Sequence, residues 1–103
     1  MGNLEGAVES YKNALKVKPE HFKSWVNMGI VLSKLKKTEL AIRALNKASE
    51  LKPDRSDVYF NLGVIYFEGR QFDKAKHAFE KVLQIDPDDR EALNAIHRLA
   101  KKD

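Results

Sequence analysis

An interval of 34 residues separates the prolines of this chain. Pro53 follows Pro19 by 34 residues, Pro87 follows Pro53 by the same number, and the 103-residue sequence contains no other proline. A proline disfavours helical geometry in the residue before it, so each of the three can end a helix. A helix end that recurs at one interval indicates a tandem repeat, which constrains the fold of the whole chain.

Other residues recur at the same interval. Advancing each residue by 34 pairs small side chains with small ones, aromatic with aromatic, and amide with amide. The matched residues include Gly29 with Gly63, Asn27 with Asn61, Trp25 with Tyr59, and Ala7 with Ala41 and Ala75. So many matches at one offset are improbable by chance, and they indicate a repeating structural unit.

Within each repeat the apolar residues follow helical spacing. Trp25, Met28, Gly29 and Leu32 lie at i, i+3, i+4 and i+7, and a similar pattern runs from Leu40 to Leu51. No segment shows the sustained alternation of a strand. The spacing predicts an all-α chain with helices over 3–18, 22–35, 38–52, 56–69, 72–86 and 90–102.

This pattern resembles the tetratricopeptide repeat (TPR) family. The resemblance rests on Trp25, Met28, Gly29, Leu32, Ala41, Leu45, Ala48 and Pro53 in one repeat, and on Tyr59, Leu62, Gly63, Tyr66, Ala75, Phe79, Val82 and Pro87 in the next. It implies a solenoid of antiparallel helix-turn-helix repeats, with about six helices in a right-handed superhelix. The sequence departs from the family locally, because Thr38 replaces a usual aromatic residue and Gly69 comes one residue early.

The repeats are expected to form one domain over 1–103. Its expected parts are the second helix of a truncated repeat at 1–19, full repeats at 22–55 and 56–89, and a capping helix at 90–103. The structural residues are Gly29, Gly63, Ala41 and Ala75, whose small size lets paired helices approach, and Pro19, Pro53 and Pro87, which end the second helices. Because one helix pair cannot bury its own apolar face, stacking of neighbouring repeats should supply most of the stability.

Composition narrows the function. There is no cysteine, which excludes disulfides and thiolate metal sites, and no apolar run reaches the roughly 20 residues that span a bilayer. We therefore expect no membrane insertion and, without a signal peptide, a cytoplasmic protein.

The charge is uneven along the sequence. Residues 1–52 carry ten Lys or Arg against five Asp or Glu, which is a weak bias toward acidic partners. The basic residues are scattered among acidic neighbours, so no nucleic-acid partner is expected.

Candidate catalytic chemistry is sparse. The histidines (His21, His77 and His97) lack metal-ligand spacing, and none of the serines has a local base signature. No glycine loop could cradle a phosphate. Asp86, Asp88 and Asp89 crowd one turn, where helix capping explains them better than cation binding. We predict a protein that is not an enzyme and has no catalytic, cofactor-binding or metal site.

In the family that the chain resembles, the first helix of each repeat lines a concave face. The expected peptide-binding groove consists of Lys23, Val26, Asn27, Ile30, Ser33 and Lys34 from one helix, and of Asp57, Phe60, Asn61, Val64, Phe67 and Glu68 from another. Several of these residues are apolar beyond what helix pairing needs, and an exposed apolar strip usually marks an interaction site. The alternative is a tighter superhelix that partly buries them.

Two asparagines suggest how the groove would bind. A side-chain amide has donors and an acceptor, so Asn27 and Asn61 can pair with the backbone of an extended peptide. Similar asparagine ladders occur in family members such as the O-linked glycosyltransferases and kinesin light chains, although asparagine here can also serve the helix pair alone. Recognition of an acidic chaperone tail is disfavoured, because Asp57 and Glu91 stand where that subfamily needs positive charge.

The sequence therefore predicts a non-catalytic protein-interaction module or scaffold that binds an extended peptide or a helix of a partner. Alternatives are a self-assembly element and a regulatory TPR segment of a larger protein. The N-terminal helix lacks a partner helix, so Leu4, Val8, Tyr11 and Leu15 should not all be covered, and we expect a weak homodimer through this helix. His97, Lys101 and Lys102 suit a C-terminal cap.

Overall fold

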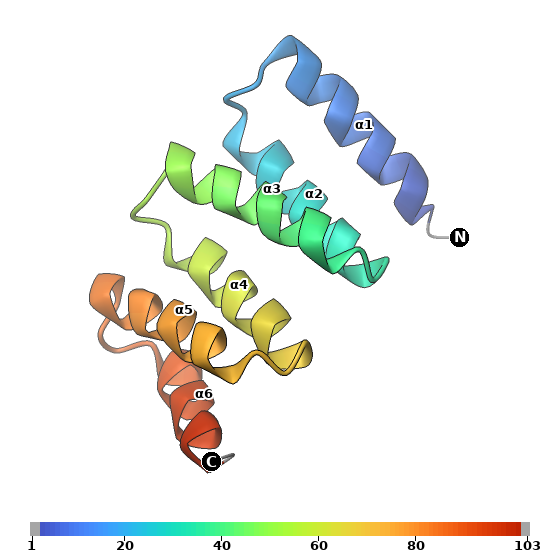
Figure 1. The fold of residues 1–103 in the computed structure, drawn as a ribbon. Coiled ribbons are helices and arrows are strands. Elements are labelled where there is room, and N and C mark those ends of the chain that lie inside the picture. The colour runs from blue at the N-terminus through green and yellow to red at the C-terminus, as the bar shows by residue number, and fades with distance from the viewer. Residues whose placement is uncertain (1–2, 102–103) are drawn as a thin grey trace. The chain divides into compact units, whose positions relative to one another are not determined.

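The computed structural model describes residues 3–101. Within that range the chain forms six α-helices and no strand: α1 (Leu4–Val17), α2 (Phe22–Lys34), α3 (Thr38–Leu51), α4 (Ser56–Glu68), α5 (Phe72–Ile85) and α6 (Arg90–Ala100) (Figure 1). The predicted all-α class and the order of the helices are confirmed. The helix ends agree with the predicted ones within two residues. Lys102, where the last helix was expected to end, lies outside the described range.

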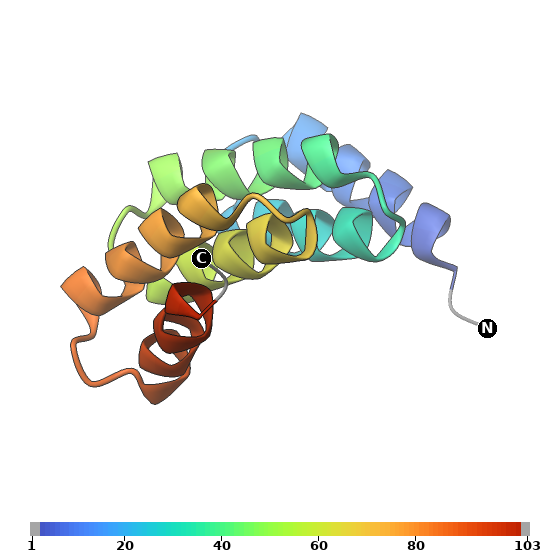
Figure 2. The ribbon, with the colours of Figure 1, turned by 60° about the horizontal axis from the view of Figure 1, so that its bottom comes forward.

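The chain divides into two compact units, Met1–Pro53 and Asp54–Asp103. In the first unit α2 packs against both α1 and α3, and in the second unit α5 packs against both α4 and α6 (Figure 2). The boundary lies two residues before the predicted start of the repeat at 56–89. The single domain over 1–103, its division into repeats and the right-handed superhelix stay predictions.

Each unit contains a close helix contact at a glycine. A Cβ atom built on Gly29 of α2 would lie 2.7 Å from Cγ of Leu45 in α3. A Cβ atom on Gly63 of α4 would lie 2.6 Å from Cε1 of Phe79 in α5. Both distances are shorter than real Cβ atoms tolerate, so in each pair a large side chain occupies the space that the missing Cβ leaves. The small Ala41 and Ala75 are fully buried on the opposing helices.

The second helices end in front of the prolines. Lys18, Lys52 and Asp86 follow α1, α3 and α5, and each has left helical geometry, with φ between −133° and −139° and ψ between 85° and 88°. Each of these residues directly precedes a proline, whose ring disfavours helical geometry at the residue before it. The same conformation therefore recurs at each of the three helix ends.

Helices α2 and α4, the expected first helices of the two full repeats, are each followed by a residue in the left-handed conformation two positions after the helix end. Lys36 has φ of 65° and Arg70 has φ of 60°, and the two lie one repeat apart. The next residue in each case donates its backbone N–H to the carbonyl five residues earlier: Lys37 to Leu32 at 2.9 Å, and Gln71 to Tyr66 at 2.9 Å. This is the Schellman arrangement, whose left-handed position favours glycine. Gly69 has φ of −83°, so the glycine of the second unit lies one residue before the position that would use it.

Three helices begin with a side-chain cap. Asn3 accepts a hydrogen bond from the backbone N–H of Gly6 at 2.8 Å, and Asp89 accepts one from Ala92 at 2.9 Å. His21 accepts one from Ser24 at 3.2 Å. The predicted capping role of the acidic turn is thus confirmed for Asp89, which satisfies an N–H group that α6 itself cannot pair.

We expect Gly63→Leu to destabilise the protein by about 1–3 kcal/mol, because the added side chain must displace the ring of Phe79 from a packed core. The matched control is Gly69→Leu, since the nearest atom to a Cβ there is 3.5 Å away, an ordinary contact. Thermal unfolding followed by circular dichroism should show a lower melting temperature only for the Gly63 variant. Equal melting of both variants would contradict this account of the helix pair.

We expect Lys36→Gly to stabilise the protein by about 0.5–1 kcal/mol, because glycine adopts a positive φ without the steric cost of a Cβ atom. Lys37→Gly is the control, since Lys37 has φ of −92° and gains nothing from glycine. Chemical denaturation measures both changes. A gain in the Lys37 variant, or a loss in the Lys36 variant, would show that backbone strain at this turn is unimportant.

Candidate functional site

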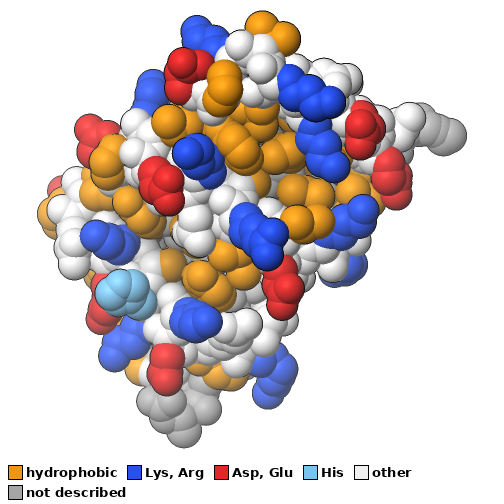
Figure 3. Space-filling view, turned by 45° about the horizontal axis from the view of Figure 1, so that its top comes forward, with side chains coloured by type: hydrophobic (Ala, Val, Ile, Leu, Met, Phe, Trp, Pro, Cys, Tyr) orange, Lys and Arg blue, Asp and Glu red, His pale blue; other side chains and the backbone are white. Residues whose placement is uncertain are grey.

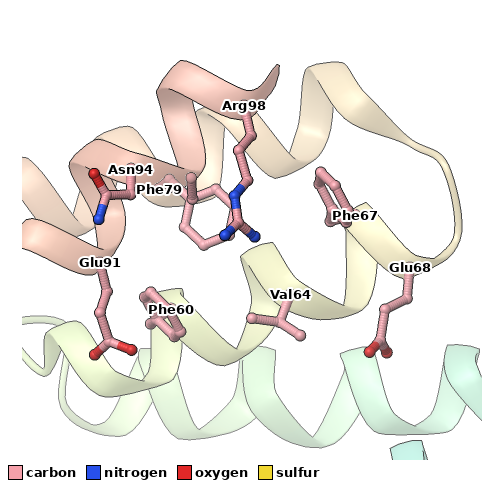
Figure 4. Close-up of a pocket in the computed structure, with 9 residues that line it drawn as sticks. Phe60, Val64, Phe67, Glu68, Phe79, Glu91, Asn94 and Arg98 are labelled. Atoms are coloured by element: carbon pink, nitrogen blue, oxygen red, sulfur yellow. The ribbon is translucent and has the colours of Figure 1, made fainter. Parts of the chain in front are cut away.

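The second unit contains a hollow between α4 and α6, with α5 behind it. Its volume is about 380 Å³, within the range of pockets that bind ligands. It is lined by Phe60, Val64, Phe67, Glu68, Phe79, Glu91, Asn94, Ala95 and Arg98 (Figure 4). We call it the α4–α6 hollow.

Aromatic rings form the floor of the α4–α6 hollow. Phe60 meets Phe79 edge to face, with ring centroids 5.4 Å apart and planes at 64°. Phe67 meets Phe72 in the same way at 5.5 Å and 61°. Edge-to-face pairs are favourable because the positive edge of one ring meets the negative face of the other. Phe79 is buried, whereas Phe60 and Phe67 are half-buried, so the floor keeps apolar surface open to a ligand.

Charged side chains stand at the rim. Glu68 and Glu91 lie toward opposite ends of the hollow, beside Phe67 and Phe60, and Arg98 reaches from α6 toward Phe79 (Figure 4). All three are exposed, and none forms an ion pair with another residue of the 3–101 range. The lining therefore carries two carboxylates and one guanidinium, together with the amide of Asn94.

The structure places the predicted groove residues of the second unit in two environments. Phe60, Val64 and Phe67 line the hollow, and Asn61 is half-buried on the same helix. Asp57 is not part of the lining: its carboxylate accepts a hydrogen bond from Arg55 at 3.0 Å, in an exposed ion pair at the start of α4. Asp57 therefore acts locally at the beginning of the helix.

In the first unit, Lys23, Asn27 and Lys34 are exposed and Ile30 is half-buried. Val26 is buried, with 9% of its surface exposed, so its expected exposure in the groove is wrong. The reason is its position on α2: Phe22, Val26 and Gly29 lie at i, i+4 and i+7, and the other two are buried as well. Val26 belongs to this packed stripe.

Five lining residues are not among the predicted groove residues: Phe79 on α5, Glu91 in the first turn of α6, and Asn94, Ala95 and Arg98 farther along α6. The signal for the last three was present in the repeat. Advancing Phe60, Asn61 and Val64 by 34 residues gives these three positions. The repeat position of Glu91 served only to argue against an acidic tail, and the predicted groove was not extended to α6.

The structure pairs one histidine with one serine. Nδ1 of His21 lies 2.7 Å from Oγ of Ser24, so this serine has an imidazole within hydrogen-bond distance although no base signature was assigned to it from the sequence. Both groups belong to the N-terminal cap of α2, and Ser24 is only 5% exposed. A substrate has little access to its hydroxyl, and we assign the pair to capping.

The described residues contain no group of three or more His, Cys, Asp or Glu side chains that could hold a metal ion. Of the helices between residues 3 and 101, none has both the length and the apolar character needed to cross a membrane.

The N-terminal helix is covered only in part, as expected. Val8 and Leu15 are buried on α1, and Leu4 and Tyr11 are half-buried. The large apolar residue left exposed on this helix is Val17, at its last turn, with 87% of its surface accessible. A homodimer through α1 stays a prediction.

Family models match three overlapping segments of the chain. Models described as "Tetratricopeptide repeat" match residues 1–48 and 56–89, and a model described as "TPR repeat" matches residues 33–69. Together they extend from residue 1 to residue 89. Comparison with curated proteins found no match.

Several solved structures are similar over nearly the whole chain. The first TPR of Spaghetti (RPAP3) bound to the HSP90 peptide SRMEEVD is 24% identical, with a TM-score of 0.89, and the match covers 98% of this chain and 80% of that one. The Arabidopsis OM64 TPR domain is 21% identical, with a TM-score of 0.88 and coverage of 97% and 83%. MamA protein is 27% identical, with a TM-score of 0.90, but the chain spans only 55% of MamA.

These matches agree with the structural observations. The helix pairs meet at glycines one repeat apart, the first helices end at equivalent left-handed residues, and the second helices end at prolines 34 residues apart. The all-α helical-repeat solenoid expected from the sequence is confirmed. The chain belongs to the tetratricopeptide repeat family.

Proposed function

We propose that the chain is a non-catalytic protein-interaction module, and that the α4–α6 hollow receives an apolar side chain from an extended peptide or helix of a partner. The observation that carries this proposal is the half-buried aromatic floor, in which Phe60 and Phe67 are packed on one side and open on the other. Fully burying one large apolar side chain contributes roughly 1.5–3 kcal/mol, so one anchor can supply much of the affinity of a short peptide.

Hydrogen bonding would fix the direction of the peptide. Asn61 follows Phe60 on α4, and its amide makes no hydrogen bond to another residue of the described range. Asn27 holds the equivalent position on α2 and is exposed. Each amide can donate to a peptide carbonyl and accept from a peptide N–H. In this proposal Asn61 makes such a contact beside the α4–α6 hollow, and Asn27 can make the equivalent contact within its own unit.

The charge of the rim favours a neutral or basic peptide. Glu68 and Glu91 outnumber Arg98 around the hollow, so a peptide with several carboxylates would meet net repulsion there. The Spaghetti structure has a bound HSP90 peptide, SRMEEVD, which is acidic toward its C-terminal end. That relative supports peptide binding by this fold, and the rim of the α4–α6 hollow supports a different choice of peptide charge.

We expect Val64→Glu to weaken binding at least about tenfold, because a carboxylate would have to be desolvated on the apolar floor. We expect Asn27→Ala and Asn61→Ala to cost about 0.5–1.5 kcal/mol each, the usual net contribution of a hydrogen bond. The measurement is titration calorimetry with peptides selected on the wild-type chain from a random library.

Lys76→Ala is the control, since Lys76 is exposed on α5 outside the hollow. Circular dichroism should show equal helicity for every variant. The proposal fails if the Val64 and Asn variants bind the selected peptides as tightly as the wild-type chain and the Lys76 control do.

A further inference from the structure

A second hollow lies in the first unit, between α1 and α3. Both helices pack on α2, which forms the floor, while α1 and α3 make little direct contact with each other. The volume is about 360 Å³, and the lining consists of Val8, Lys12, Trp25, Met28, Leu32, Lys37, Leu40, Arg43, Ala44 and Lys47. We call it the α1–α3 hollow. Figure 3 shows hydrophobic side chains gathered over these helices, with Lys and Arg side chains between and around them.

The α1–α3 hollow exposes an apolar side chain, Leu40, that the packing of the helices does not require. Val8 on α1 and Met28 and Leu32 on α2 are buried, and Trp25 is half-buried. Leu40, however, is 47% exposed on α3. The residue one repeat later is Lys74, so the repeat itself does not need an apolar side chain at this position.

Four cationic side chains surround this apolar floor, and no acidic side chain belongs to the lining: the four are Lys12, Lys37, Arg43 and Lys47. Lys12 lies 3.8 Å from Glu9, and Lys47 lies 3.8 Å from Glu50. Both ion pairs are exposed, and each joins two residues of one helix: the first pair is on α1 and the second on α3. Exposed pairs of this kind contribute little to stability. The side chains of Lys37 and Arg43 form no ion pair with a residue of the 3–101 range.

We propose that the α1–α3 hollow binds an acidic segment of a partner protein, which inserts a large apolar side chain beside Leu40 and Trp25. A concave apolar floor fits a side chain that projects from a peptide, whereas a flat membrane surface cannot fill it. The four cations attract carboxylates on either side of that anchor and raise the rate of encounter. Nucleic acid suits the site less well, because most of the floor is aliphatic and offers only one ring for a base to stack on.

Trp25 provides a direct measurement. It is the only tryptophan of the chain, its ring lines this hollow, and its indole N–H donates to the carbonyl of Pro19 at 2.7 Å. The probe is a short synthetic peptide with a central Leu-Phe pair and glutamates on both sides. Titration into the full chain should give a saturable change in Trp25 fluorescence, weakened by added salt. A peptide of the same pattern with lysines in place of the glutamates should give none.

Three variants separate charge from apolar contact. Lys37→Glu combined with Arg43→Glu should weaken binding of the acidic probe at least about tenfold. Leu40→Lys should weaken it as well, although it adds positive charge, because the apolar contact is lost. The control is Lys76→Glu combined with Lys101→Glu, which changes the net charge equally at exposed positions outside the hollow and should bind like the wild-type chain.

Several outcomes would overturn the proposal. One is no saturable fluorescence change with the acidic probe. Another is equal loss of binding in the control, which would mean that net charge alone attracts the peptide. A third is unchanged binding by Leu40→Lys. A fourth is a larger Trp25 response to anionic phospholipid vesicles than to the probe, which would make the surface a membrane contact. Val64→Glu should leave this binding unchanged, so failure here is distinct from failure at the α4–α6 hollow.

Discussion

The close approach of two helices at a glycine is the contact on which both hollows depend. At Gly63 the missing Cβ lets the ring of Phe79 lie directly against α4, and there the ring also meets Phe60 edge to face. The floor of the α4–α6 hollow is therefore a consequence of the packing. In the first unit Gly29 admits Leu45 in the same way, which draws α3 onto α2 and brings Ala44 beside the floor of the α1–α3 hollow.

The two units share a packing scheme but differ in charge. The α4–α6 hollow has two carboxylates and one guanidinium in its lining, whereas the α1–α3 hollow has four cations and no carboxylate. The charged side chains that line both hollows are exposed, so they contribute little to the helix contacts. A repeat protein can therefore keep its buried residues and vary its partners, because fold and binding depend on different side chains.

Much of the fold was predictable because helix ends have local causes. Proline acts on the residue just before it, and the helix period is visible over a dozen residues, so six helices could be assigned with ends close to the observed ones. The unusual place of Gly69 was also visible in the sequence. Its explanation was not, because only the backbone shows that Arg70, one residue later, adopts the left-handed conformation.

The candidate site was predictable only in part. Their repeat position suggested Phe60, Val64 and Phe67, which line the α4–α6 hollow, but the same position also suggested Val26, which is buried. Periodicity tells which residues share one face of a helix, but not which neighbouring helix covers that face.

The sequence alone determined the 34-residue period, the all-α class, the helix ends and the family, since these follow from residue types at fixed spacings. Only the tertiary structure decided that α6 supplies one wall of the α4–α6 hollow, and that α1 and α3 leave a basic, apolar hollow above α2. The physical reason is that a hollow is the space left between packed helices, and its lining depends on their distances and on the side chains that meet across them.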